Sequence, residues 1–256
     1  MIDERVHVAI RSHGRAGHVT TAAVVPFAYV WAPESQADAY REHHGDHVMT
    51  IPDYADGSLA RKSNAILDAS PCEWTVILDD DITAIRFYEE GVDRDMTADH
   101  IRQMIEHHFG LADELGVKLW GINQNRDEMA YKPCTPFALL APILGPLTGH
   151  LGPTLRYDES VLGKDDYDFW LQNIATYHRT LRANRYHYIH DHGRQRGGFV
   201  AQRTKAVEWA GVDRMIAKWG DKVFRVGGSP GARRNRKATP TGNVLNSMVR
   251  VPIKGC

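Results

Sequence analysis

An apolar run from Trp74 to Leu78 ends directly in three consecutive aspartates, Asp79, Asp80 and Asp81. Such a run is typical of a buried strand, and ligands of open α/β sheets bind at the carboxyl ends of strands. Three adjacent carboxylates repel one another unless a cation neutralises them, and hard oxygen ligands suit Mg²⁺ or Mn²⁺. The sequence therefore predicts a metal and phosphate site here. The alternative is a solvated acidic turn.

Strand-like and helix-like segments alternate along the chain, which predicts an α/β fold with a mostly parallel sheet. The expected strands are Val6–Ile10, Phe27–Trp31, Val48–Ile51, Trp74–Leu78, Val117–Ile122 and Tyr186–His190. The expected helices begin at Pro33, after the N-caps Ser58 and Thr97, at Asp165 or Asp166, and near Ala201. The stretch from Asn123 to Tyr157 is rich in Pro and Gly, so we expect loops that face a substrate there.

The length of 256 residues, with 43% apolar and 25% charged residues, suits a single globular domain. We expect this domain over residues 1–225, followed by a basic segment over residues 226–256 that contains Arg233 to Lys237. That segment is either a solvated tail or an element that contacts phosphates of a donor or of DNA. The net charge of -1 neither demands nor excludes a polyanionic partner.

The longest apolar stretch, Phe137 to Leu147, is interrupted by two prolines and a glycine, and no signal peptide is visible. The three cysteines show no CxxC spacing, and their odd number argues against a disulfide framework. We therefore expect a cytoplasmic protein with no membrane partner.

Two further pairs of residues fit a nucleotide-sugar site. Arg11 and Ser12 leave the first strand, where a base and ribose are held. Arg61 and Asn64 lie about one turn apart on a predicted helix, so they share a face. Arg suits bidentate contact with phosphate, and Asn donates to phosphate oxygens, which favours a donor site over surface pairing.

The sequence Gly163-Lys164-Asp165-Asp166 places two carboxylates at the amino terminus of a predicted helix. We expect Asp165 to serve as the N-cap, because its side chain can accept from the first free backbone N–H groups. Asp166 is then free to accept a proton from an acceptor hydroxyl. Asp166 is the first candidate for the catalytic base, and Asp165 is the second.

The last predicted strand ends at His190, and the polar segment that follows it contains His192. A histidine at a strand end can complete a divalent metal site, and His192 is the better candidate of the two. Arg194 and Arg196, next to a Gly-Gly pair, are typical of a loop that closes over phosphates.

The order Asp79-x-Asp81-x-Thr83 also fits the nucleophile motif of haloacid-dehalogenase-type phosphatases. In those enzymes the nucleophile follows the first strand, whereas three predicted strands precede the strand that leads into Asp79. Position in the chain therefore favours the nucleotide-sugar interpretation, with the phosphatase as an alternative.

The string from Ile10 to Thr21 (IRSHGRAGHVTT), the Arg61/Asn64 helix and the strand end at Leu78–Asp81 resemble the TET-associated glycosyltransferases of bacteriophages. The resemblance runs from about Val6 to Trp219. It implies a GT-A-like, Rossmann-like α/β/α sandwich in one domain. It also implies an enzyme that uses a UDP-sugar, such as UDP-glucose, and Mn²⁺ or Mg²⁺ to glycosylate DNA containing 5-hydroxymethylcytosine or a related 5-hydroxymethylpyrimidine.

The resemblance also implies roles for single residues. Asp79 and Asp81 would flank the metal and the diphosphate, Asp80 would contact the metal or the ribose, and Asp165 or Asp166 would be the base. The commoner acidic pair of inverting GT-A enzymes begins with Glu, where this chain has Asp165. Single displacement would invert the anomeric carbon. A protein, glycan or small-molecule acceptor, and a nucleotide-binding module without activity, stay open as alternatives, as does the oligomeric state.

Overall fold

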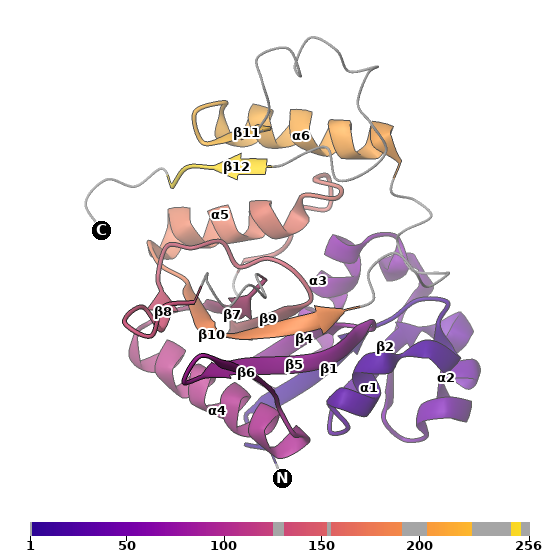
Figure 1. The fold of residues 1–256 in the computed structure, drawn as a ribbon. Coiled ribbons are helices and arrows are strands. Elements are labelled where there is room, and N and C mark those ends of the chain that lie inside the picture. The colour runs from indigo at the N-terminus through magenta and orange to yellow at the C-terminus, as the bar shows by residue number, and fades with distance from the viewer. Residues whose placement is uncertain (1, 125–130, 153–154, 191–203, 227–246, 252–256) are drawn as a thin grey trace.

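The computed structural model describes residues 2–124, 131–152, 155–190, 204–226 and 247–251. A ten-stranded sheet runs through the molecule, with helices on both faces (Figure 1). In spatial order its strands are β3 (Val48–Ile51), β2 (Tyr29–Pro33), β1 (Val6–Arg11), β4 (Trp74–Asp79), β9 (Leu147–Leu151), β7 (Leu119–Asn123), β10 (Leu181–His190), β5 (Ile82–Glu89) and β6 (Val92–Asp95). The short strand β8 (Phe137–Ala138) pairs with β10 beside this path.

The sheet is mixed and mostly parallel. β3, β2, β1 and β4 are parallel neighbours, and β7 and β10 form another parallel pair. β9 lies antiparallel between β4 and β7, and β5 lies antiparallel between β10 and β6. The carboxyl ends of β1, β4, β7 and β10 therefore meet at one edge of the sheet, which confirms the predicted α/β class.

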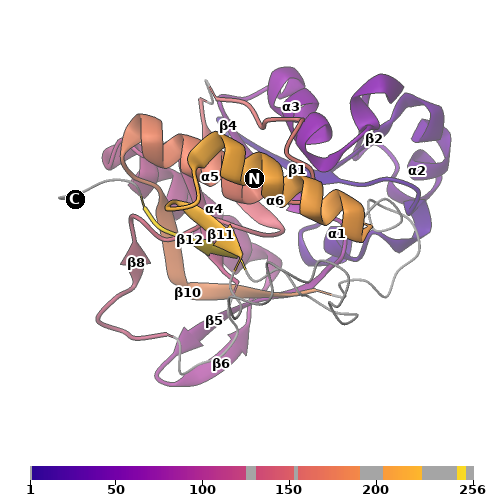
Figure 2. The same ribbon diagram turned by 90° about the horizontal axis from the view of Figure 1, so that it is seen from above.

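Helices cover both faces of the sheet, as the α/β/α prediction requires. α1 (Thr20–Val24), α2 (Ala37–His44) and α4 (Ala98–Glu114) lie on one face. α3 (Leu59–Ala69), α5 (Asp165–Tyr177) and α6 (Lys205–Trp219) lie on the other, toward the viewer in Figure 2. Short 3₁₀ turns occur at Ala16–His18, Glu34–Gln36 and Asp53–Asp56. Among the described residues, no helix combines the length and the apolar character that a bilayer crossing needs.

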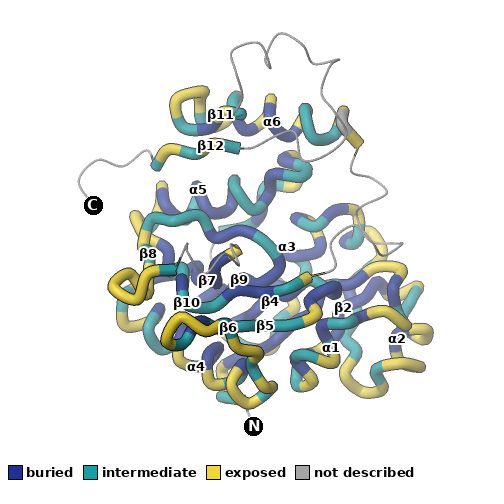
Figure 3. The backbone as a smooth tube through the Cα atoms, viewed as in Figure 1, coloured by how far each residue is buried: buried dark blue, intermediate teal, exposed yellow. Residues whose placement is uncertain are grey.

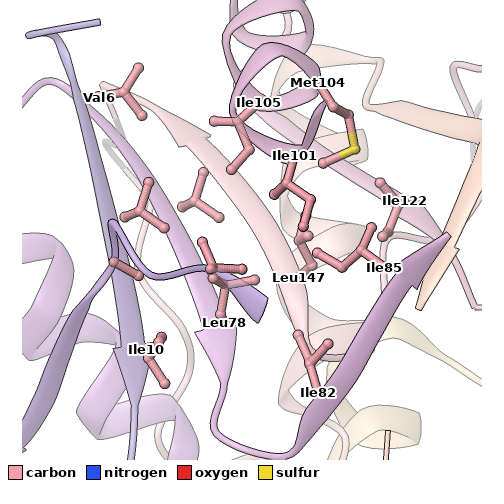
Figure 4. Packing of buried hydrophobic residues seen from close by; sticks show 14 of the residues in the cluster. Val6, Ile10, Leu78, Ile82, Ile85, Ile101, Met104, Ile105, Ile122 and Leu147 are labelled. Atoms are coloured by element: carbon pink, nitrogen blue, oxygen red, sulfur yellow. The ribbon is translucent and has the colours of Figure 1, made fainter. Parts of the chain in front are cut away.

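Alternate residues of the strands belong to two hydrophobic clusters, one on each face of the sheet. In β1, Val6, Val8 and Ile10 join the cluster under α4, while Ala9 joins the cluster under α3 and α5. Figure 4 shows the first cluster, in which Leu147 and Ile85 of the sheet lie near Ile101 of α4. The central strands are buried along their length, and exposed residues gather in the outer loops (Figure 3). This two-sided burial explains why the central strands are apolar runs.

Several predicted elements are confirmed. The third strand has the predicted bounds Val48–Ile51, and β1 extends the first by one residue to Arg11. Ser58 and Thr97 are the N-caps of α3 and α4, because their side chains accept from the backbone N–H of Arg61 and His100.

Other predictions need correction. The stretch Asn123–Tyr157, predicted to be loops, contains β8 and the central strand β9. The hairpin of β5 and β6 and the helix α1 were not predicted, and β2 starts two residues later than predicted because a turn after α1 occupies Phe27 and Ala28. β9 is buried on both faces, so its sequence shows no alternation.

Two short strands late in the chain pack onto the domain. The antiparallel strands β11 (Phe224–Val226) and β12 (Ser247–Val249) form a second, two-stranded sheet. Val226 and Val249 pack against the hydrophobic cluster under α5. The predicted basic residues Arg233 to Lys237 lie outside the described residues.

Asp168 joins α5 to α6. Its buried carboxylate accepts from Trp219 Nε1 at 2.7 Å, Lys218 Nζ at 2.9 Å and Gln172 Nε2 at 2.7 Å. We expect Asp168→Ala to lower the free energy of unfolding by about 3 kcal/mol, because it leaves the Lys218 cation and the Trp219 N–H without this partner.

Urea unfolding would measure this loss. Asp158→Ala is the matched control, because Asp158 accepts from the same Lys218 at 2.8 Å but at a partly exposed site. We expect about 1 kcal/mol or less for the control. Equal losses in both variants would contradict the role of Asp168.

Candidate active site

Arg11 and Asp79 end two neighbouring parallel strands and are direct partners in the sheet register. Arg11 Nε donates to Asp79 Oδ1 at 2.6 Å, and Arg11 Nη1 donates to Ser63 Oγ of α3 at 2.7 Å. Burial opposes the charge on Arg11, but the carboxylates of Asp79 and Asp165 outweigh it and raise the arginine pKa. Arg11 is therefore a fixed cation at the carboxyl edge of the sheet.

Asp80 points away from this edge into a buried network. Arg15 Nη1 donates to Asp80 Oδ1 at 2.6 Å, and the Ser12 hydroxyl donates to Asp80 Oδ2. Ser12 Oγ is also 2.7 Å from the hydroxyl oxygen of Tyr40. Both predicted donor contacts, Ser12 and Asp80, therefore hold the loop after β1 in this structure, and their contact with a donor stays a prediction.

Asp81 is the acid of the cluster that is best suited to a cation. Its side chain is buried, and its Oδ1 has no hydrogen-bond partner among the described residues. Burial raises the pKa of Asp81 to about 6, with further contributions from Asp79 and Asp80. A buried carboxylate oxygen without a donor is costly unless a cation occupies the space beside it. The residues therefore fit a hard divalent cation.

Asp165 and Asp166 form the first turn of α5. The N-cap is Lys164 and no side chain caps the helix, so the predicted cap at Asp165 is wrong. Asp166 Oδ1 accepts from its neighbour's backbone, Tyr167 N–H, at 2.8 Å, and the Gly145 N–H also donates to Asp166. Burial and then the neighbouring Asp166 raise the pKa of Asp165 to about 7, and burial raises the pKa of Asp166.

Both acids face the arginine at the sheet edge. A small pocket is lined by Arg11, Asp165 and Asp166, together with Gly145, Thr148 and Tyr157. The negative charge of Asp79 contributes to the raised pKa of Asp165, so the two acid groups lie close together. The structure thus brings together Arg11, Asp79 and the acidic pair, which are more than 60 residues apart in the sequence.

His190 is the last residue of β10 and pairs with Ile82, directly after Asp81. Its exposed ring therefore lies at the same edge as the acids. The other predicted members of this group, His192, Arg194 and Arg196, lie outside the described residues. Within the described stretches, no three His, Cys, Asp or Glu side chains already form a metal-binding cluster.

Arg61 and Asn64 are hydrogen-bonded to the segment that precedes α5. Arg61 Nε donates to Glu159 Oε2 at 2.9 Å, and the Asn64 amide bonds both the N–H and the C=O of Tyr157 at 2.8 and 2.9 Å. Both residues share one side of α3, as predicted. Their proposed contact with the donor stays a prediction.

The neighbouring residues of α3 were missed by the sequence analysis. Lys62 is buried, forms an ion pair with Asp56 and donates to the backbone oxygen of Ser12. Ser63 holds Arg11. The signal was available for Lys62, because it lies three residues after Leu59 and four before Ile66, on the apolar stripe of the helix.

Tyr188, Gln124 and Gly145 are also part of the site and were not predicted. Tyr188 is buried on β10, and its hydroxyl is hydrogen-bonded to the Gln124 amide. Gly145 has a φ of +88°, and a Cβ at this position would overlap the Tyr188 hydroxyl and lie 2.9 Å from Gln124 Nε2. Only glycine fits here without strain. Gly145 therefore connects Tyr188 and Gln124 to Asp166.

The fold is that of the GT-A-like glycosyltransferases. Glucosyl-3-phosphoglycerate synthase from Mycobacterium tuberculosis shares it in a crystal structure with Mn²⁺, UDP and glucosyl-3-phosphoglycerate, with 11% identity over 87% of this chain and 83% of that chain and a TM-score of 0.51. The same enzyme with Mg²⁺ and UDP gives 13% identity over 88% and 84%, with a TM-score of 0.51. At this identity the likeness shows the fold alone.

Residues 6–198, well over half of the chain, match the family model described as TET-Associated Glycosyltransferase. The chain belongs to this family and is a glycosyltransferase. The matched region contains Asp79 to Asp81, the acidic pair Asp165 and Asp166, and the segment from His190 to Gly198. No curated protein matches the chain. The phosphatase alternative is therefore wrong, because both the family and the fold are those of glycosyltransferases.

Proposed function

We propose that this glycosyltransferase moves a sugar from a UDP-sugar onto the hydroxymethyl group of 5-hydroxymethylcytosine, or a related 5-hydroxymethylpyrimidine, in DNA. The observation that carries the proposal is the meeting of Asp79, Arg11 and the pair Asp165/Asp166 at one edge of the sheet. A sugar nucleotide needs charge compensation at its diphosphate, and an acceptor hydroxyl needs a base. The two acid groups supply these two needs side by side.

The donor would lie at the Arg11 side of the site. Asp79, Asp81 and His190, with His192, would hold Mn²⁺ or Mg²⁺, and the unpartnered Oδ1 of Asp81 supports this assignment. When bound, such an ion offsets the charge that develops on the departing UDP. Arg11, with Arg194 and Arg196, would face the phosphates as permanent cations. UDP, Mn²⁺ and Mg²⁺ are bound by the mycobacterial synthase of the same fold, which supports this donor class.

Asp166 would accept the proton of the attacking hydroxyl. The two backbone N–H groups of Gly145 and Tyr167 fix the orientation of its carboxylate, and burial raises its pKa. The charges of both Arg11 and Asp79 act on Asp165, which supports a role for Asp165 nearer the donor. A base on one side of the sugar and a leaving group on the other favour single displacement, with inversion of the anomeric carbon.

The acceptor class is supported by the family and by basic residues. The family is named for its association with TET enzymes. The segment from Arg233 to Lys237 supplies cations that suit backbone phosphates. A protein, glycan or small-molecule acceptor is the competing proposal.

The test is UDP release from a panel of UDP-sugars with Mn²⁺ or Mg²⁺, with and without DNA that contains 5-hydroxymethylcytosine, followed by mass analysis of the DNA. We expect fast release only when metal, one donor and modified DNA are all present. Slow hydrolysis of the donor that ignores the DNA would keep the donor and remove the acceptor. Release with a glycan or protein in place of DNA would support the competing proposal.

We expect the acidic limb of the kcat/KM profile to lie above the ordinary carboxyl range. Burial and the neighbouring Asp166 raise the pKa of Asp165 to about 7, and burial raises that of Asp166. A general base acts only when ionised, so activity is full above the raised pKa and falls as the pH drops through it.

A pH profile of sugar transfer between about pH 5 and pH 9 would locate this limb. Asp165→Asn should move it to lower pH, because the repulsion between the two carboxylates disappears. A wild-type limb in the ordinary range near pH 4 would show that the pair is not the titrating base.

A further inference from the structure

An irregularity in β10 brings Tyr188 close to Gln124, which follows β7. Ala183 pairs with Ile122 of β7, but the next partner, Asn123, pairs with His187, so β10 bulges between these points. A bulge bends the strand and redirects its side chains. Beyond it, Tyr188 pairs with Ile85 of β5, and its hydroxyl lies against Gly145. Gln124 is the first residue after β7 and is exposed at the carboxyl edge of the sheet.

The two side chains are connected to the proposed base by short links. The Tyr188 hydroxyl and Gln124 Nε2 both lie against Gly145. Gly145 in turn donates its N–H to Asp166. Gly145 therefore links the Gln124 amide to Asp166, the proposed base. A group beside the base is a group beside the acceptor hydroxyl from which the base takes its proton.

The buried tyrosine fixes the exposed amide. Tyr188 is only 5% exposed, and its hydroxyl is hydrogen-bonded to the Gln124 amide. A glutamine amide offers two donor hydrogens and one acceptor oxygen, more than one bond to Tyr188 uses. Its other hydrogen-bonding positions can face the acceptor.

We propose that Gln124 contacts the acceptor base at the ring substituent next to its hydroxymethyl arm, and that Tyr188 is the residue that positions Gln124. The proposal rests on the proposed function. In a pyrimidine with a group at C5, the neighbouring C4 substituent is an amine that donates in cytosine and a carbonyl that accepts in uracil. An amide can satisfy either one by presenting its oxygen or its NH₂ group.

The variant Gln124→Glu separates the cytosine amine from the uracil carbonyl, because an ionised carboxylate can only accept hydrogen bonds. The experiment measures kcat/KM for duplexes that carry 5-hydroxymethylcytosine or 5-hydroxymethyluracil, at saturating UDP-sugar, together with the KM of the donor. We expect Gln124→Glu to lower kcat/KM for the uracil duplex at least tenfold relative to the cytosine duplex. Gln103→Glu, an exposed glutamine on α4, is the matched control and should leave the ratio unchanged.

Tyr188→Phe tests the positioning role. We expect it to lower kcat/KM for both duplexes about tenfold and to leave the donor KM unchanged, and the double variant with Gln124→Ala should lose no more than Gln124→Ala alone. An unchanged base preference in Gln124→Glu, or a rise in donor KM in place of acceptor KM, would overturn the proposal. Wild-type enzyme that glycosylates neither duplex would instead refute the proposed function, and the proposal with it, before any variant is measured.

Discussion

Asp166→Asn is expected to lower kcat for sugar transfer by about 10² to 10⁴-fold and to leave the KM of the UDP-sugar nearly unchanged. The amide has nearly the same shape as the carboxylate but cannot take the proton from the acceptor hydroxyl. The Gly145 and Tyr167 N–H groups still find an oxygen acceptor in asparagine, so the local fold is kept. Steady-state UDP release with modified DNA measures both constants.

Asp165→Asn is the matched comparison, because it changes the adjacent acid in the same helical turn. Asp165 faces Arg11 and Asp79, so its loss should raise the donor KM more than it lowers kcat. A greater loss of kcat in Asp165→Asn than in Asp166→Asn would reverse the two roles. The anomeric configuration of the product, read by NMR, should be opposite to that of the donor, since retention would require a covalent or front-face route that the proposal does not contain.

Local sequence signals predicted the parts of the fold that depend on near neighbours. The caps Ser58 and Thr97 bond backbone N–H groups three residues away, so their pattern is visible in the chain itself. The strand that ends at Asp79 is an almost continuous apolar run followed by an acidic cluster, and this pattern predicted a buried strand.

Elements that depend on distant partners were not predictable in this way. β5 buries Ile82, Ile85 and Tyr88, a spacing of three that matches neither strand alternation nor a long helix. β9 contains Gly149, which weakens a strand pattern. In the structure that glycine is required, because the indole of Trp120 from β7 occupies the space of its side chain.

Some residues of the candidate site were likewise predictable from local sequence signals, and others were not. Arg11, Asp79 and the Asp165/Asp166 pair stood out because charged residues directly follow a strand or begin a helix. In the structure Arg11 and the acidic pair line one pocket, and Asp79 is hydrogen-bonded to Arg11. Gly145 and Tyr188 carried no such signal. Their importance follows from a contact across 43 residues of chain that only the folded sheet creates.

Asp81→Asn should have the second largest effect and should separate function from stability. We expect transfer to fall at least about 10²-fold, because the variant loses a charged ligand of the proposed cation. The metal-free variant should nevertheless be more stable than the wild type at pH 8, by on the order of 2 kcal/mol. Burial and the neighbouring acids raise the pKa of Asp81 to about 6, so ionising it in the folded protein is costly.

The sign of the pH dependence follows from that shift. The folded state holds the Asp81 proton more tightly than the unfolded chain, whose carboxyl pKa is 3.8. Wild-type stability from this group therefore falls as the pH rises from about 4 to about 6 and stays low above it. The advantage of the Asn variant should vanish near pH 4. Thermal melts at pH 4 and pH 8, with EDTA or with Mn²⁺, measure these differences, and Asp46→Asn at an exposed site is the control.

Mn²⁺ provides the decisive comparison, because a ligand that binds only the folded state stabilises it. Addition of Mn²⁺ at pH 8 should raise the melting temperature of the wild type and of Asp46→Asn, and should have little effect on Asp81→Asn. In the wild type, bound Mn²⁺ would then offset the free-energy cost of burying the ionised Asp81 carboxylate. A variant that is less stable than the wild type at pH 8 without metal would mean that Asp81 is held by a partner inside the protein, and the acid cluster would not be the cation site.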